Sequence, residues 1–401
     1  LKNPSRERCC RSSRLAMGSP REFQDEFQRP ELSLSAIKAA IPAECFKKNM
    51  RRSVMWMVID FLVWAAAVLA YASFQTTTSY QSLPLAIQYL TMFAYWSVSG
   101  FYMWCLFVVG HDCGHGTFSN SEVVNAICGH LTHGAIMTPF WPWALSHNRH
   151  HLHHNHVAKD YSHIWTTQEC DWNETMANLD QDFAKRKKEL RSDAEASSFS
   201  ELLVVFLVPP VAWFLYTVVG IFDGNHYLPL PGRLWRTSTT GDKLRCLVST
   251  SVNTFFLIVF YSMCDSFARF CEMYVGSWFG FAFCLYAVTF LQHHGEDTKV
   301  YDGSTWTFVR GAFETEDRTY GAPLDMLHHH ISDCHLIHHL FFRSVPHYNL
   351  RAATDALQAH LNKNKVGHLR KHKRSTWWFL ELFHVRRKAW AADLVSTVKQ
   401  E

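Results

Sequence analysis

The chain is poor in charged residues. Asp, Glu, Lys and Arg make up only 18% of its 401 residues, and the formal net charge is +4. So small a positive excess gives no sign of a nucleic-acid partner. The basic residues stand in short blocks beside apolar runs, which is typical of segments that flank membrane helices. We therefore expect a lipid bilayer, and no nucleic acid, among the partners of this chain.

The common cysteine and glycine motifs are also missing. Twelve cysteines are present without one CxxC pair, which excludes a zinc ribbon and gives no disulfide framework. There is no CxxCH haem motif, no GxGxxG nucleotide motif and no HExxH zinc-protease motif. If the protein performs redox chemistry, we expect its electrons to come from a separate donor.

The first residues are not expected to form a signal peptide. Residues 1–16 read LKNPSRERCCRSSRLA, with no initiator methionine, no apolar core and no small-residue cleavage site. We expect Met17 to be the natural start and residues 1–16 to lie before it. Residues 1–34 are predicted to form a disordered polar tail.

Hydrophobic residues, in contrast, are abundant. They form 48% of the chain, with 30 Phe and 15 Trp. Four apolar runs approach or exceed the roughly 20 residues that a membrane helix needs: Val54–Phe74, Leu83–Gly110, Leu247–Cys264 and Val275–Leu291. A fifth run, Leu202–Phe222, has basic flanks on both sides and two central prolines, so we interpret it as interfacial or re-entrant.

These runs predict the architecture. We expect an all-α membrane protein with four transmembrane helices in two hairpins, interfacial helices and a cytosolic cap that carries clustered histidines. The connection Gly116–Ser146 should lie along the interface or re-enter the bilayer. The main domain is predicted over residues 35–361, followed by a basic cytosolic region over residues 362–401, with both termini cytosolic.

Three histidine boxes stand beside the apolar runs. HDCGH contains His111 and His115, HNRHH contains His147, His150 and His151, and HLIHH contains His335, His338 and His339. Spacings of three and four residues place imidazoles on one face of a helix. One such box alone is more often a hydrogen-bonded histidine patch. Three together predict a metal site.

The number of histidines narrows the choice of metal centre. Imidazole suits zinc, copper, iron and nickel, but eight histidines exceed the needs of one zinc ion. The Glu-x-x-His motif of soluble di-iron bundles is required twice and occurs once, at Glu381 and His384. An all-histidine site for two non-haem iron ions is therefore predicted.

The boxes resemble those of the membrane-bound fatty acid desaturases. WTFVRG at Trp306–Gly311, DRTYG at Asp317–Gly321 and VPHYNL at Val345–Leu350 are similar to segments of the methyl-end, delta-12 and omega-3 branch. The resemblance covers residues 40–361. It implies an O2-dependent enzyme that uses two irons to introduce a cis double bond toward the methyl end of a fatty acyl chain.

The resemblance also implies further ligands. A YLQH-like motif falls on His293 in FLQHH, and an HNITD-like motif falls on His329 in HHISD. His294 stays open as an alternative to His293, and His328 and His330 stay open as alternatives to His329. Ligand histidines need a partner for the second ring nitrogen. Asp112 and Asp333 are the expected partners, and Asp160 and Asp325 are further candidates.

The expected partners follow from the same resemblance. They are O2, a fatty acyl-CoA or acyl-phospholipid substrate, and cytochrome b5 with its NADH-dependent reductase, at the cytosolic face of the endoplasmic reticulum membrane. A hydroxylase or acetylenase of the same superfamily is an alternative. A histidine-rich metal transporter is disfavoured, because transport predicts polar residues within the spans and these contain little beyond Asp60 and Gln88.

Overall fold

A computed structural model describes residues 26–156, 159–160, 162, 209–220, 223–295, 298–301, 303–375 and 397–398. Most of the predicted N-terminal tail, the charged stretch 171–191 and much of the basic C-terminal region lie outside these ranges. The described part is mostly helical.

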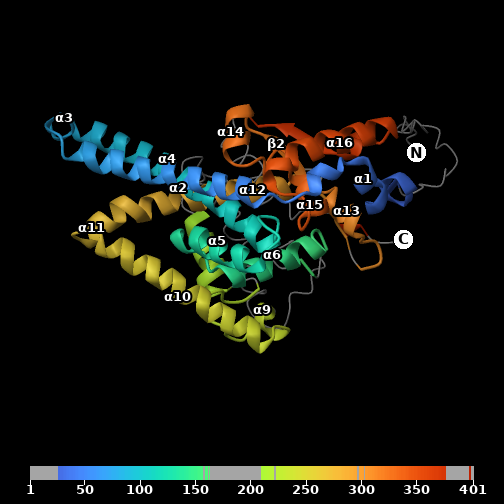
Figure 1. Cartoon of the computed structure of the whole chain (residues 1–401), viewed down its shortest axis with the longest axis horizontal. Coiled ribbons are helices and arrows are strands. Elements are labelled where there is room, and N and C mark those ends of the chain that lie inside the picture. The colour runs from blue at the N-terminus through green and yellow to red at the C-terminus, as the bar shows by residue number, and fades with distance from the viewer. Residues whose placement is uncertain are drawn as a thin grey trace, which may run out of the picture.

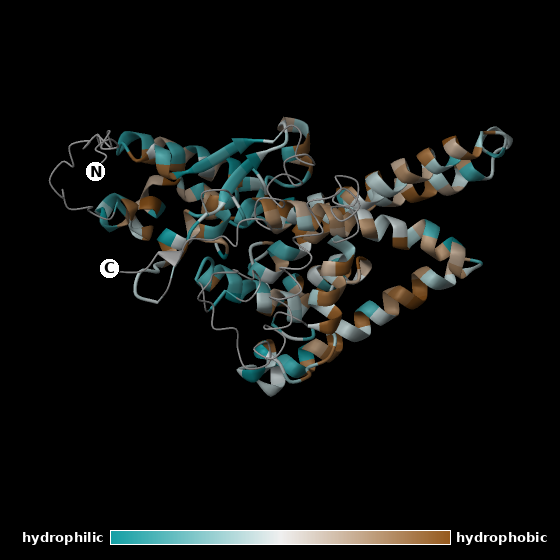
Figure 2. Cartoon of the chain, turned by 180° about the vertical axis from the view of Figure 1, so that it is seen from behind, coloured by the Kyte–Doolittle hydropathy of each residue, from teal (hydrophilic) through white to brown (hydrophobic). Residues whose placement is uncertain are grey.

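Four helical segments are long and apolar enough to cross a membrane, as predicted. They are α2 (Met50–Gln75), α4 (Leu85–His115), α10 (Thr240–Ser262) and the continuous segment Phe267–His293. The last comprises α11 (Phe267–Phe270), the π-helical turn η5 (Cys271–Val275) and α12 (Gly276–His293). Apolar residues are frequent along all four (Figure 2).

The four helices form two pairs (Figure 1). The short helix α3 (Thr78–Gln81) connects α2 to α4, and α11 stands at the turn between α10 and α12. Both turns lie at one end of the molecule, and the smaller elements form a cap at the other end. The two-hairpin topology across a bilayer remains a prediction. The cytosolic location of the cap remains a prediction.

Close packing joins the two pairs through α4 and α12. A Cβ atom at Gly100 would lie 2.6 Å from the Ser277 carbonyl oxygen and 2.7 Å from Gly280 Cα. The absence of a side chain therefore lets the two backbones touch. As a result, the cap-side ends of α4 and α12, which carry His111, His115 and His293, are placed relative to each other.

The cap is built from short helices and two small sheets. In the described residues, the helices that lie outside the two pairs of spans and their connections are η1 (Glu26–Gln28), η2 (Pro30–Leu32), α1 (Leu34–Ala40), η3 (Ala43–Phe46), α5 (Glu122–Ala135), α6 (Phe140–His153), η4 (Leu215–Val219), α9 (Arg233–Arg236), α13 (Phe308–Ala312), α14 (Ala322–Leu327), α15 (His335–Phe341), η6 (His347–Asn349), α16 (Leu350–Lys363) and η7 (Gly367–Leu369). Of the predicted fifth run, the structure describes an apolar helix over Pro209–Val219, which includes η4 and in these described residues is shorter than the four spans.

The strands were not predicted. In one sheet β2 (Glu316–Thr319) pairs in parallel with β3 (Lys371–Arg374), and in the other β1 (Val300–Tyr301) pairs in parallel with β4 (Thr397–Val398). The strands have two to four residues, too few for period-2 alternation to stand out in the sequence. The β2–β3 pair joins chain beyond residue 361 to the cap.

Candidate metal centre

Each histidine box lies on a helix, two of them in its last turns and the third from its first residue. His111 and His115 form the last turn of α4, which ends where Gly116 adopts φ +73°. His147, His150 and His151 belong to the last turns of α6, and His335, His338 and His339 to α15. Spacings of three and four residues put the rings of one box on one helical face.

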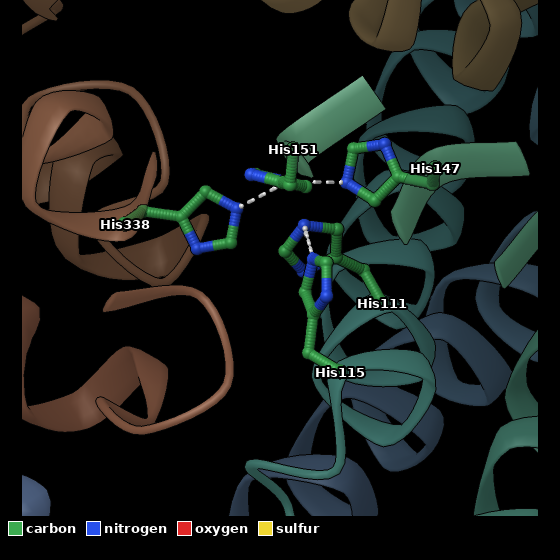
Figure 3. A group of neighbouring side chains, drawn as sticks. All are labelled: His111, His115, His147, His151 and His338. Atoms are coloured by element: carbon green, nitrogen blue, oxygen red, sulfur yellow. Dashed lines mark hydrogen bonds between the residues drawn. The ribbon is translucent and has the colours of Figure 1, made fainter. Parts of the chain in front are cut away.

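Five histidines from these three helices form the first group (Figure 3). One nitrogen from each ring lies within 4.8 Å of the others, the members being His111, His115, His147, His151 and His338. The Nε2 atoms of His111 and His115 are 3.2 Å apart, those of His147 and His151 are 3.0 Å apart, and those of His151 and His338 are 3.2 Å apart.

A second group adjoins the first. One nitrogen each from His150, His293 and His339 lies within 4.8 Å of the other two. His335 extends this group, because its Nε2 atom is 3.1 Å from that of His293 and 3.2 Å from that of His339. The rings of His151 and His339 are 4.2 Å apart between centroids, so the two groups touch. All eight box histidines and the predicted His293 therefore come together.

In three of these histidines, the ring nitrogen that points away from the group, Nδ1, makes the kind of hydrogen bond that is typical of metal ligands. The Nδ1–H groups of His150 and His335 donate to Asp160 Oδ1 at 2.9 Å and to the Ile331 carbonyl at 2.9 Å. His115 Nδ1 donates to Asn148 Oδ1 at 3.2 Å. In neutral imidazole, a proton on Nδ1 leaves a lone pair on Nε2. Each of these lone pairs then points into a group, as in metal sites with a supporting outer shell.

Burial keeps these rings neutral. It lowers the pKa of His335 to about 3, and burial together with neighbouring imidazoles holds the pKa of His147, His151, His338 and His339 well below the ordinary range. A metal ligand must be deprotonated, so neutral imidazole is the form required. Imidazole nitrogens that face one another at hydrogen-bond distance and are largely shielded from water fit a metal centre.

The DRTYG segment positions two of the ligand-bearing elements. Asp317 Oδ1 accepts a hydrogen bond from the Leu336 N–H at 2.8 Å in the first turn of α15, and Arg370 Nε lies 2.6 Å from Asp317 Oδ2. The buried Arg318 donates from Nε to the Leu291 carbonyl at 2.9 Å, near the end of α12. Sequence reasoning found this segment only as a family motif and did not assign these roles.

Asp112 does not directly pair with a box histidine at hydrogen-bond distance. Its Oδ2 accepts from His347 Nδ1 at 2.9 Å and from the His347 N–H at 3.0 Å, whereas its Oδ1 lies 3.6 Å from His111 Nδ1. His347 belongs to the VPHYNL segment, so Asp112 ties that segment to box one. Asp160, held as a further candidate, makes the direct contact to a ligand histidine.

The other predicted residues lie elsewhere. His329 Nε2 is 2.8 Å from Asp60 Oδ2 of α2, and the structure does not bring His329 to either group. This pairing explains the one acidic residue of that span. Asp333 contacts His330 Nδ1 at 3.1 Å and Arg351 at 3.3 Å. A motif gives the order of residues, but which element each side chain meets depends on packing.

The alternatives to the predicted ligands are also placed outside both groups. His294 Nδ1 lies 3.1 Å from the Phe290 carbonyl, and His328 Nε2 lies 3.7 Å from Asp325. His154, expected to be structural, contacts the carbonyls of His151 and Phe308 at 2.7 and 3.1 Å. His163 falls outside the described residues.

Comparison with known proteins agrees with the site. The model of the family "Fatty acid desaturase" matches residues 87–372. A delta-12 fatty acid desaturase of Caenorhabditis elegans is 35% identical over 90% of this chain and 88% of its own length. An omega-3 fatty acid desaturase of the same organism is 34% identical over 81% of this chain and 73% of its own.

A plant relative has a more specific name. It is the acyl-lipid omega-3 desaturase (cytochrome b5), endoplasmic reticulum, of Arabidopsis thaliana, which is 32% identical over 83% of this chain and 77% of its own length. The family match includes all nine grouped histidines, nearly all of α4, and the whole of α10 and of the segment Phe267–His293. On this match and these identities, the chain belongs to the fatty acid desaturase family.

Proposed function

We propose that the protein introduces a cis double bond toward the methyl end of a fatty acyl chain, at the delta-12 or omega-3 position, with O2 as oxidant. The observation that carries this proposal is the pair of touching imidazole groups, with five and four histidines. The names of the relatives support the position of the double bond.

Two non-haem iron ions fit the two groups. His111, His115, His147, His151 and His338 would hold one ion, and His150, His293, His335 and His339 the other. Bound iron would supply the oxidising power, derived from O2, that a saturated C–H bond requires and no side chain possesses. His329 is not part of the proposed ligand set, because it contacts Asp60.

The chain's own residues orient the ligands and limit access of water. Asp160, Asn148 and the Ile331 carbonyl fix the Nδ1–H tautomers, so that Nε2 faces the metal positions. Eight of the nine histidines are buried. A water-poor site favours selective oxidation of the substrate, because reactive species are protected from side reactions.

The remaining partners are proposed from the relatives. The substrate is an acyl chain on phospholipid or CoA, and the electrons come from cytochrome b5 and its NADH-dependent reductase at the endoplasmic reticulum membrane. The printed name of the plant relative includes an acyl-lipid substrate, cytochrome b5 and this membrane. We propose that the cap, both termini and the metal centre face the cytosol.

Expression in yeast supplied with oleic and linoleic acids tests this function. Mass spectrometry of the fatty acids should show linoleic acid made from oleic acid, or a new omega-3 double bond. His150→Ala should abolish the product while the protein remains present. A hydroxylated fatty acid as the product would show that the enzyme inserts oxygen and does not desaturate. Purified protein that contains zinc and no iron would refute the oxidase proposal.

A further inference from the structure

Phe342 lies between the five-histidine group and the protein surface. Its ring stacks on His151, with 4.7 Å between centroids and 15° between planes, and meets His115 edge-on at 5.1 Å. The side chain is 6% exposed. The next residue, Arg343, is exposed, and its guanidinium carbon lies 5.3 Å from the Phe342 ring centroid. A continuous set of contacts therefore runs from an exposed cation to two proposed iron ligands.

A second group of cations begins nearby. The Asn49 N–H donates to Tyr348 Oη at 2.6 Å, and the Arg52 guanidinium carbon lies 4.5 Å above the Tyr348 ring. These contacts bring the start of α2 to the turn that follows α15. Five residue steps separate Arg343 from Tyr348, and extended chain spans at most about 18 Å over that length. Both cationic positions therefore fit within one protein interface, which covers about 800 Å² on each partner.

The charge of this surface favours an acidic partner. The basic block at the start of α2 consists of Lys47, Lys48, Arg51 and Arg52. Within the described part of the chain, no carboxylate forms an ion pair with Arg51, Arg52 or Arg343. Exposed charges of one sign attract a partner of opposite charge and increase its association rate.

Membrane lipids would not explain the whole arrangement. Anionic headgroups attract basic residues beside a membrane helix, which accounts for the block at the start of α2. They do not account for a cation placed on an aromatic ring that itself contacts two iron ligands. A partner that delivers electrons uses both features, because electron tunnelling weakens steeply with distance through protein.

We propose that a small acidic one-electron carrier protein docks over Arg343 and the basic block of α2, and that electrons enter the metal centre beside Phe342. This inference rests on the proposed function. Desaturation converts one –CH2–CH2– unit, O2, two electrons and two protons into –CH=CH– and two waters. The carrier supplies the two electrons in two successive transfers, and water supplies the two protons. Phe342 fills the gap between carrier and ligands and is not itself oxidised.

The docking site is tested with purified, iron-loaded full-length protein, acyl substrate, O2 and the reduced soluble domain of cytochrome b5. Arg343→Glu should raise the carrier concentration needed for half-maximal turnover by about tenfold and weaken its dependence on salt. The matched control is Lys363→Glu, which reverses an exposed charge at the end of α16 and should behave as wild type.

A second reductant separates the two proposals. Turnover driven by dithionite does not require docking, so Arg343→Glu should keep it. Loss of product with both reductants in the wild-type protein would refute the proposed function itself. If Arg343→Glu keeps dithionite turnover and needs the same carrier concentration for half-maximal turnover as the wild type, only the docking site is refuted.

The role of Phe342 is tested by turnover rates divided by the iron bound to each variant. Phe342→Leu should lower the ratio of carrier-driven to dithionite-driven turnover, and Phe342→Trp should restore it. An unchanged ratio in Phe342→Leu would overturn the entry route. If Arg343→Glu instead weakens binding to phosphatidylserine vesicles and leaves the carrier kinetics unchanged, the surface is a lipid contact and the docking proposal is wrong.

Discussion

Asp160 gives the sharpest test of how the metal centre is supported. Its Oδ1 accepts from His150 Nδ1 at 2.9 Å, and its Oδ2 accepts from the Asn155 N–H at 3.1 Å. Both bonds are buried. In Asp160→Asn one of the two carboxylate oxygens is replaced by an NH2 group, which is a donor. Either His150 Nδ1–H or the Asn155 N–H then faces this donor in place of an acceptor.

The size of the effect follows from this conflict. If the amide nitrogen faces His150, the imidazole loses the acceptor that holds its proton on Nδ1, and the tautomer with a free Nε2 is no longer favoured. Losing an outer-shell partner of a metal ligand lowers metal affinity or activity by about 10- to 100-fold. This range corresponds to about 1.4–2.8 kcal/mol of binding free energy.

Iron retention measures this effect directly. Purified wild-type and Asp160→Asn proteins are dialysed against increasing chelator concentrations, and iron per chain is measured by elemental analysis beside product formation in microsomes. The variant should lose iron at a chelator concentration about 10- to 100-fold lower. Asp355→Asn, which alters an exposed carboxylate on α16, is the control. Equal iron retention in Asp160→Asn and the control would refute the supporting role of Asp160.

Three further predictions concern the scaffold. Gly100→Ala should lower the free energy of unfolding by about 1–3 kcal/mol, because its Cβ would lie 2.6 Å from a carbonyl of α12. The thermal midpoint in detergent should fall accordingly, whereas Gly303→Ala, with open space around it, should leave the midpoint unchanged. Asp60→Asn should destabilise the fold by about 1.5–3 kcal/mol, because His329 Nε2 loses its hydrogen bond to a buried carboxylate, yet folded protein should keep full iron; loss of iron would return His329 to the ligand set. Asp317→Asn should reduce iron retention in the chelator assay, because it weakens the cap on α15, and unchanged retention would contradict that role.

The sequence predicted the elements that depend on local pattern. Apolar length located the four spans, since a membrane helix must cover a fixed thickness, and basic flanks with two central prolines set the fifth apolar run apart. Spacings of three and four residues indicated that the histidines of each box share one helical face, and the structure places all eight in two adjoining groups. His293 required the family resemblance, because a single histidine at a helix end carries no spacing signal.

Tertiary structure decided the contacts between distant segments. His338 reaches His151 across 187 positions, and Asp60 reaches His329 across 269. No local periodicity encodes either distance. Packing sets the positions of the helices that carry the grouped histidines. It includes the close approach of α4 and α12 at Gly100 and the contacts of Asp317 and Arg318 on the short strand β2. The sequence by itself therefore determined which residues are able to bind metal, whereas packing decided which of them share a centre and which, like His329, pair with a carboxylate.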